Sequence, residues 1–167
     1  MKKYCFDTSG ISNPLEFMPR DIHESLWSNI LEFIEGGNVA TTKEVFDEMV
    51  YIPNGIGDFL NKPKEIVLLE VGDSTWDWQT YIGHVARTQD EYHDYISENN
   101  GNISGTVGLN DISIICLAKS LGLPLVSMEV LVPENSLKKR RIPNICKYES
   151  IEHLTFNDFL RKENFKF

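Results

Sequence analysis

The sequence has no long apolar run and no paired cysteines, and these two absences narrow the class of protein. None of its apolar runs approaches the ~18 residues of a membrane-spanning helix. The first charged residue after the Met-Lys-Lys-Tyr start, Asp7, comes too early for a signal peptide. Three scattered cysteines, Cys5, Cys116 and Cys146, form no CxxC pair, so neither a zinc ribbon nor a disulfide framework is indicated. We therefore expect a protein of the reducing cytoplasm that does not bind membranes.

The sequence also lacks the signature motifs of nucleotide-binding folds and has few positively charged residues. Neither GxxxxGK[ST] nor GxGxxG occurs, and the four histidines lack HxxxH spacing, so nucleotide folds and histidine metal sites have no support. Lysine and arginine number 16 against 25 acidic residues, which gives a net charge of −9. This charge argues against a nonspecific nucleic-acid binder, which must neutralise phosphates. A nuclease can still be acidic overall if metal ions bridge its carboxylates to the phosphate.

The chain of 167 residues, with no repeat and no linker, suits one domain over residues 1–167. Periodicity and turn signals predict strands over 3–6, 39–40, 66–71, 123–128 and 151–154. They predict helices over 22–35, 43–51, 76–98, 109–121 and 143–148, and a last helix that begins near residue 155. This alternation of short strands and helices predicts an α/β fold with a mainly parallel sheet.

Local signals set several of these boundaries. Asp21 is expected to cap the helix over 22–35, and Thr41 to Glu44 form a capping-box pattern before the helix over 43–51. Gly122 is expected to close the helix over 109–121, and Pro143 suits the first turn of the helix over 143–148.

Acidic residues stand where such a sheet would place a ligand. Ligands of open parallel sheets bind outside the carboxyl ends of the strands. Asp7 and Glu129 each directly follow a predicted strand, and Asp111 lies at the start of a helix. Glu44 and Glu48 share one helix face, so either could point to the same edge. Four acids from four separate elements are therefore expected to converge.

Converging carboxylates repel one another unless a cation neutralises them, and their hard oxygens suit Mg²⁺ or Mn²⁺. Such ions activate water and stabilise the leaving oxygen in phosphodiester hydrolysis. Each acid taken singly has a structural alternative. Asp7 could cap a turn, Glu44 could complete the capping box, and Glu48 and Glu129 could be solvated charges. Asp111 could be an acid that the helix dipole stabilises at the helix N-terminus. Only the joint placement of the acids therefore points to a site.

Four segments resemble the conserved motifs of the PIN-domain family. They are Phe6-Asp7-Thr8-Ser9, residues 44–49 (EVFDEM), residues 110–118 (NDISIICLA) and residues 125–129 (LVSME). The register of the second motif favours Glu48 over Glu44. The usual fourth acid is Asp, and Glu129 in its place is similar to a subgroup of uncharacterised bacterial and archaeal PIN-like proteins. Members of this subgroup also carry an Ile-Pro-x-x-Cys segment after a basic loop, here residues 142–146 (IPNIC).

The resemblance implies a three-layer α/β/α sandwich and a metal-dependent ribonuclease of single-stranded RNA. Its catalytic metal ligands would be Asp7, Glu48, Asp111 and Glu129, with Mg²⁺ or Mn²⁺ as the cofactor. Many small prokaryotic members are toxins of toxin–antitoxin pairs and form dimers. The resemblance therefore implies an antitoxin protein and a second copy of the chain as partners, besides RNA.

Polar neighbours of the acids are candidates for supporting roles. Thr8 or Ser9 could position the first acid or a water, Ser127 could do so beside Glu129, and Asn110 belongs to the third motif. Hydrogen bonding to the backbone at turns is an equal alternative for these hydroxyls.

A basic run follows the fourth acid and consists of Lys138, Lys139, Arg140 and Arg141. It could contact RNA phosphates, which would partly offset the net charge. A solvated loop and a contact for an acidic partner peptide are the alternatives.

Two other functions compete with the nuclease. The first is a binding module that acts through a protein partner, for which Glu129 and the net charge of −9 are the motives. The second is another carboxylate–magnesium enzyme on a doubly wound sheet, such as a phosphatase that uses an Asp nucleophile. Such an enzyme commonly has a second Asp two residues after the first, and Ser9 in that place counts against it.

Overall fold

The computed structural model describes all 167 residues, and four short parallel strands form its centre. The strands are β1 (Tyr4–Phe6), β2 (Val39–Ala40), β3 (Leu125–Val126) and β4 (His153–Leu154), in the order β2-β1-β3-β4. The first three strands are fully buried, as expected for a parallel sheet that helices cover on both faces. All four carboxyl ends lie at the same edge of the sheet, because every pair is parallel.

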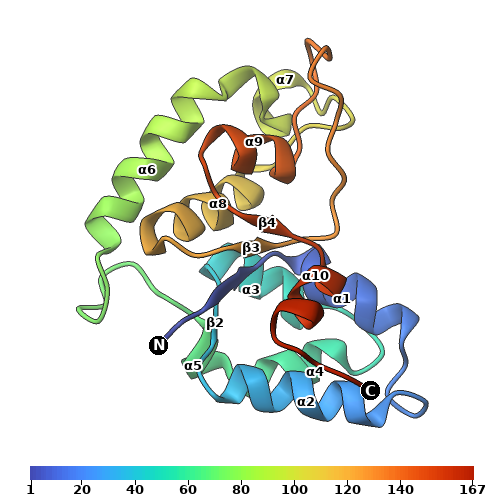
Figure 1. Ribbon diagram of the computed structural model, residues 1–167. Helices are drawn as coiled ribbons and strands as arrows, with labels where there is room; N and C mark the ends of the chain where they lie inside the picture. Colours follow the sequence, from blue (N-terminus) through green and yellow to red (C-terminus); the bar gives the residue numbers. More distant parts are fainter.

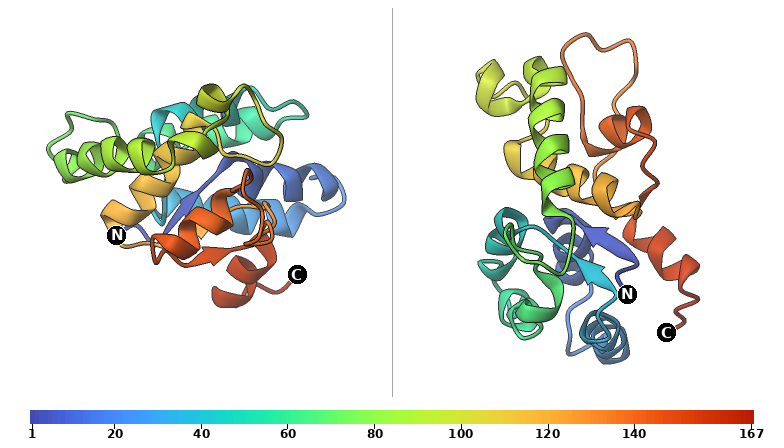
Figure 2. Two further views of the ribbon diagram at one scale, coloured as in Figure 1. Left: turned by 90° about the horizontal axis from the view of Figure 1, so that it is seen from above. Right: turned by 90° about the vertical axis from the view of Figure 1, so that its left-hand side faces the viewer.

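Helices lie on both sides of this sheet. They are α1 (Thr8–Phe17), α2 (Glu24–Glu35), α3 (Lys43–Val50), α4 (Ile56–Asn61), α5 (Lys64–Val67), α6 (Trp78–Glu91), α7 (Ser97–Asn100), α8 (Leu109–Leu121), α9 (Ile142–Tyr148) and α10 (Phe156–Lys162), with a 3₁₀ turn η1 (His93–Tyr95). Figure 1 shows α6 to α9 above the strands and α2, α4 and α5 below them. The right-hand view of Figure 2 shows the same division. The predicted α/β class, with three layers and a parallel sheet, is confirmed.

Helix α8 is the central helix of the fold. Its residues from Ile112 to Ala118 are all buried, so it is apolar on every side and packs between α6 and the strands. The bounds predicted for this helix are confirmed, and Gly122 ends it in the left-handed conformation at φ 63°. Pro143 lies in the first turn of α9, as predicted. No helix combines the length and the apolar character needed to cross a membrane.

Two predicted elements were wrong in type or extent. The apolar run 66–71 is not a strand, because Ile66 and Val67 complete α5 and only an isolated bridge joins Leu68 to Thr41. A short apolar run does not distinguish a strand from a buried helical turn. The predicted helix over 76–98 ends at Glu91 and continues as η1 and α7. The break follows Tyr92, whose hydroxyl donates a 3.0 Å hydrogen bond to Glu149 at the end of α9.

The two N-cap predictions, at Asp21 and Thr41, were also wrong. Helix α2 begins at Glu24 and not at Ile22, because Ile22 and His23 form a turn that closes onto the carbonyl of Pro19. The N-cap of α3 is Thr42, and its hydroxyl bonds to Ser113 on α8 at 2.8 Å instead of capping the helix.

Other differences concern length. The strands predicted over 3–6, 123–128 and 151–154 shorten to β1, β3 and β4, and the helix α1 was not predicted. Helix α1 contains Gly10 and Pro14, which weaken a helix in isolation, and its formation depends on packing against the sheet.

Candidate active site

Asp7 connects the first strand to the first helix and is only 5% exposed. It is the N-cap of α1, and its Oδ2 accepts hydrogen bonds from the backbone N–H of Ser9 at 3.1 Å and from Ser9 Oγ at 2.6 Å. Ser9 Oγ itself accepts a hydrogen bond from the N–H of Met128, at 3.1 Å, just beyond β3. Ser9 therefore links the first and fourth motifs and fixes the orientation of Asp7.

Glu48 on α3 is tied to two of the other motifs. Its Oε2 accepts a hydrogen bond from Thr8 Oγ1 at 2.8 Å, and its Oε1 accepts one from Asn110 Nδ2 at 2.5 Å. Glu44 lines a separate cleft with Tyr81, between α3 and α6. The structure thus brings Glu48, and not Glu44, to the first and third motifs.

Asp111 lies in the first turn of α8, where its Oδ2 accepts the N–H of Gly108 at 2.7 Å. Only residues 122–124 connect α8 to β3, so α8 runs against the strand and begins at the carboxyl edge of the sheet. Glu98 supports the same helix start, since its Oε1 accepts the N–H of Leu109 at 3.1 Å. Glu98 was not predicted, because nothing in its local sequence connects it to a helix that begins eleven residues later.

Glu129 follows β3 and is held from the other side by α9. Its Oε2 accepts a 2.8 Å hydrogen bond from the N–H of Ile142. Ser127, which is fully buried, accepts the N–H of Glu129 at 3.4 Å and forms a 2.8 Å hydrogen bond with Nε2 of His153 on β4. No sequence signal assigned a role to His153, and the sheet register places it beside Ser127.

The charges of the four acids act on one another. Burial raises the pKa of Asp111 to about 7; the Gly108 N–H lowers it, and the charges of Asp7, Glu129 and Glu48 raise it. Burial also raises the pKa of Asp7 and of Glu129, although the hydrogen bonds from Ser9 and Ile142 oppose these two shifts. The acids predicted from four separate segments therefore lie within electrostatic reach at one edge of the sheet.

The carboxylate oxygens of these acids suit a hard cation, but they do not form a ready set of three ligands. No group of three or more Asp, Glu, His or Cys side chains is arranged to hold a metal ion as it stands. Mg²⁺ is commonly bound by one or two carboxylates, with waters and substrate phosphates completing its shell. The second oxygens of Asp111 and Glu129 receive no hydrogen bond and are not sealed from solvent, so both remain available as ligands.

The four residues of the basic run differ in exposure and in contacts. Lys138 and Lys139 are exposed, whereas Arg140 and Arg141 are half-buried. The guanidinium of Arg140 lies 4.8 Å from the centre of the Tyr95 ring. The loop that carries this run, residues 131–141, projects at the top of Figure 1.

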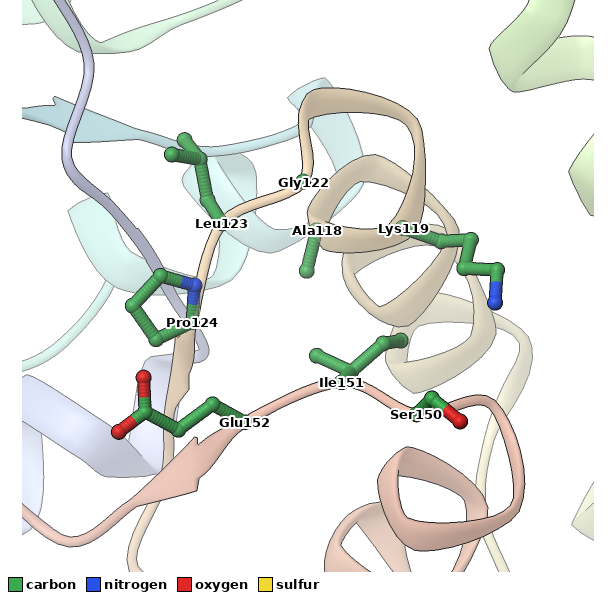
Figure 3. A pocket seen from close by; sticks show the side chains of 8 residues that line it. All are labelled: Ala118, Lys119, Gly122, Leu123, Pro124, Ser150, Ile151 and Glu152. Atoms are coloured by element: carbon green, nitrogen blue, oxygen red, sulfur yellow. The ribbon is translucent and has the colours of Figure 1, made fainter.

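A further pocket lies at the opposite edge of the sheet (Figure 3). Leu123 and Pro124 precede β3, and Ile151 and Glu152 precede β4, so these residues line the amino edge. Glu152 is its only acid, and that side chain forms an ion pair with Lys162 at 2.6 Å. The pocket is thus separate from the four acids and lacks their chemistry.

Comparisons with known proteins place the chain at the level of a family. No curated protein matches it. Among solved structures, VapBC-1 from nontypeable Haemophilus influenzae is similar over 92% of this chain and 98% of that one, with 13% identity and a TM-score of 0.49. The family model described as "Domain of unknown function (DUF4411)" matches residues 4–167. This range contains all four strands, all ten helices and all four acids, and the protein therefore belongs to the DUF4411 family.

Proposed function

We propose that this protein is a metal-dependent endoribonuclease of the PIN type that hydrolyses phosphodiester bonds of single-stranded RNA. Asp7, Asp111 and Glu129 are the proposed ligands of Mg²⁺ or Mn²⁺, and Glu48 acts directly or through a water. The observation that carries the proposal is the convergence of these acids, from four segments that resemble the PIN motifs, at the carboxyl edge of the parallel sheet.

The hydrogen bonds around the acids support this assignment. Asp7, Asp111 and Glu129 each receive a hydrogen bond from a backbone N–H group, and these bonds fix the direction of the carboxylates before any ligand binds. Partners that orient metal ligands in this way are usually needed for full metal affinity.

When bound by Asp7, Asp111 and Glu129, a cation would supply activation of the attacking water and would offset charge on the leaving oxygen. The chain supplies the rest. Glu48 holds Thr8 and Asn110 at the rim, where their polar groups can orient a water or a ribose. The raised pKa of Asp111 means that its carboxyl releases a proton when a cation binds near neutral pH.

The resemblance to PIN proteins also leads us to propose a biological role for the protein. A toxin of a toxin–antitoxin pair would be restrained by an antitoxin protein and could act as a homodimer in the cytoplasm. Coexpression with the product of a neighbouring gene, followed by copurification and an RNA-cleavage assay, tests this role.

One observation favours a second candidate, a catalytically weak or inactive PIN-like module that acts through a protein partner. No three acids are arranged as a ready ligand set, and both oxygens of Glu48 are occupied by hydrogen bonds within the protein. Tight binding of a partner, together with no cleavage in any metal, would support it.

The deciding experiment compares the wild type with Asp7→Asn and Asp111→Asn in RNA cleavage with Mn²⁺ or Mg²⁺. Both variants are expected to lose more than about 100-fold in rate, since even residues that only orient a metal ligand cost about 10- to 100-fold. Asp90→Asn is the matched control, because Asp90 is exposed on α6 and forms no ion pair. Calorimetric titration with each metal should show binding to the wild type and to the control only. Full activity in both site variants would refute the proposed function.

A further inference from the structure

The two arginines of the basic run have different surroundings. The guanidinium of Arg140 lies 4.8 Å from the ring centre of Tyr95 and 5.7 Å from that of Tyr148. Its Nη1 donates hydrogen bonds of 2.6 Å to the carbonyls of Ser136 and Lys139. Arg140 is thus engaged within the protein, where it holds the loop of residues 131–141 against η1 and α9.

The end of this loop is fixed by a buried amide. Asn144 is 1% exposed, and its Oδ1 accepts the N–H of Val132 at 3.0 Å and that of Arg141 at 3.2 Å. Its Nδ2 donates a 2.8 Å hydrogen bond to the carbonyl of Val132. One side chain therefore joins the two ends of the loop and sets the backbone position of Arg141.

That position is beside the fourth acid. The residue after Arg141 is Ile142, whose N–H donates the 2.8 Å hydrogen bond to Glu129 Oε2. The backbone at Arg141 and Ile142 is thus held against the carboxylate of Glu129 at the carboxyl edge of the sheet.

The Arg141 side chain nevertheless has no partner within the protein. It forms no ion pair and donates no hydrogen bond, although it is half-buried. Arg87 and Arg161, by contrast, pair with carboxylates at 2.6 and 3.0 Å, and Arg140 stacks on aromatic rings. A guanidinium held at the edge of four acids without a partner has five donors free for an incoming anion.

We propose that Arg141 binds a phosphate of the substrate at the edge of the acidic site, whereas Arg140 only maintains the shape of the loop. The inference rests on the proposed function and assigns a residue for recognition of the RNA backbone. A guanidinium matches phosphate oxygens with two parallel hydrogen bonds, which a lysine does not reproduce. In a chain with a net charge of −9, this contact would also counter the repulsion between the acids and RNA.

The test measures binding of a fluorescein-labelled single-stranded RNA in EDTA, where a metal-dependent enzyme does not cleave it. Arg141→Gln should weaken binding by about tenfold, as expected for the loss of a charged hydrogen bond. It should reduce the slope of log K against log salt by about 0.7, the value for one phosphate contact on a single strand. Arg141→Lys should lie between this variant and the wild type.

Lys62→Gln is the matched control, since it removes one positive charge from an exposed residue at the end of α4. All variants should keep the thermal stability of the wild type, because the Arg141 side chain bonds to nothing and its backbone bonds to Asn144 remain. If the wild type binds too weakly in EDTA, cleavage with Mg²⁺ decides, and Arg141→Gln should raise KM about tenfold.

The outcomes separate this assignment from the proposed function. If the wild type binds or cleaves RNA and Arg141→Gln matches Lys62→Gln, the role of Arg141 is refuted and the nuclease stands. If the wild type neither binds nor cleaves RNA with any metal, the proposed function is refuted, and the assignment of Arg141 with it.

Discussion

Thr8 Oγ1 donates a 2.8 Å hydrogen bond to Glu48 Oε2, which joins the start of α1 to the last turn of α3. The other oxygen of Glu48 accepts a hydrogen bond from Asn110 on α8. Three helices that begin or end at the carboxyl edge of the sheet are thus connected through one carboxylate. Glu44, one helical turn earlier, takes no part in this connection.

This connection predicts different effects for the two glutamates of α3. Glu48→Gln should lower the affinity for Mg²⁺ or Mn²⁺ by about tenfold or more, because it removes a charge and disturbs the orientation of the site. A glutamine has one oxygen and one amide, so it cannot accept hydrogen bonds from Thr8 and Asn110 through two separate oxygens. Calorimetric titration of each variant measures the effect.

Glu44→Gln is the matched control, with the same change on the same helix, and it should leave metal affinity and cleavage unchanged. Equal metal affinities in the two variants would remove Glu48 from the site.

A second prediction concerns the contact between α1 and β3 that supports Asp7. A Cβ atom on Gly10 would lie 2.3 Å from the backbone oxygen of Val126, which is closer than real contacts allow. Gly10→Ala should therefore push α1 away from β3, at a cost of about 3 kcal/mol. In a thermal melt this corresponds to a fall of about 6–12 °C in Tm for a domain of this size.

Gly83→Ala tests whether the effect comes from the close contact. Gly83 lies within α6, and a Cβ atom there would have no heavy atom within 4 Å. The same substitution should stabilise the protein by about 0.5–1 kcal/mol, because alanine favours a helix. A Gly10→Ala variant as stable as the wild type would contradict the packing of α1 on β3.

The parts of the fold that sequence predicts well are those with strong local signals. Helix α8 was predicted at its observed bounds, because its apolar run is closed by Gly122 and followed by Pro124. Helix α1 was missed, because Gly10 and Pro14 contradict a helix locally, and its formation depends on packing against β3, α3, α4 and α10. The break after α6 lies at Tyr92, whose hydroxyl bonds to Glu149, 57 residues away, and such a distant contact has no local signal.

The same distinction applies to the candidate site. The four acids stand in recognisable segments, so sequence alone could name them. Several contacts that support them join distant parts of the chain: the N–H of Met128 reaches Ser9 across 119 residues, and Glu98 on α7 accepts the N–H of Leu109 at the start of α8. The four basic residues 138–141 look equivalent as a sequence. Only the folded structure separates Arg140, which packs on aromatic rings and bonds to backbone carbonyls, from Arg141.

The raised pKa of Asp111 gives a prediction for stability as a function of pH in the absence of metal. The pKa of about 7 in the folded state exceeds the ordinary 3.8 of an Asp. Between these values the folded protein binds more protons than the unfolded chain, so stability falls as pH rises through this window. Asp111→Asn removes this penalty, and an asparagine oxygen can still accept the N–H of Gly108.

Thermal melts in EDTA should therefore give similar Tm values for the wild type and Asp111→Asn at pH 4. At pH 8 the variant should be more stable by about 5 °C, which corresponds to about 2 kcal/mol for a domain of this size. Adding Mg²⁺ at pH 8 should raise the Tm of the wild type and leave that of the variant unchanged, since only a folded site that binds the ion gains stability from it. Asp90→Asn should follow the wild type throughout. A difference between the wild type and Asp111→Asn that does not change from pH 4 to pH 8 would show that the carboxyl is not perturbed, and the electrostatic coupling of the four acids would have to be abandoned.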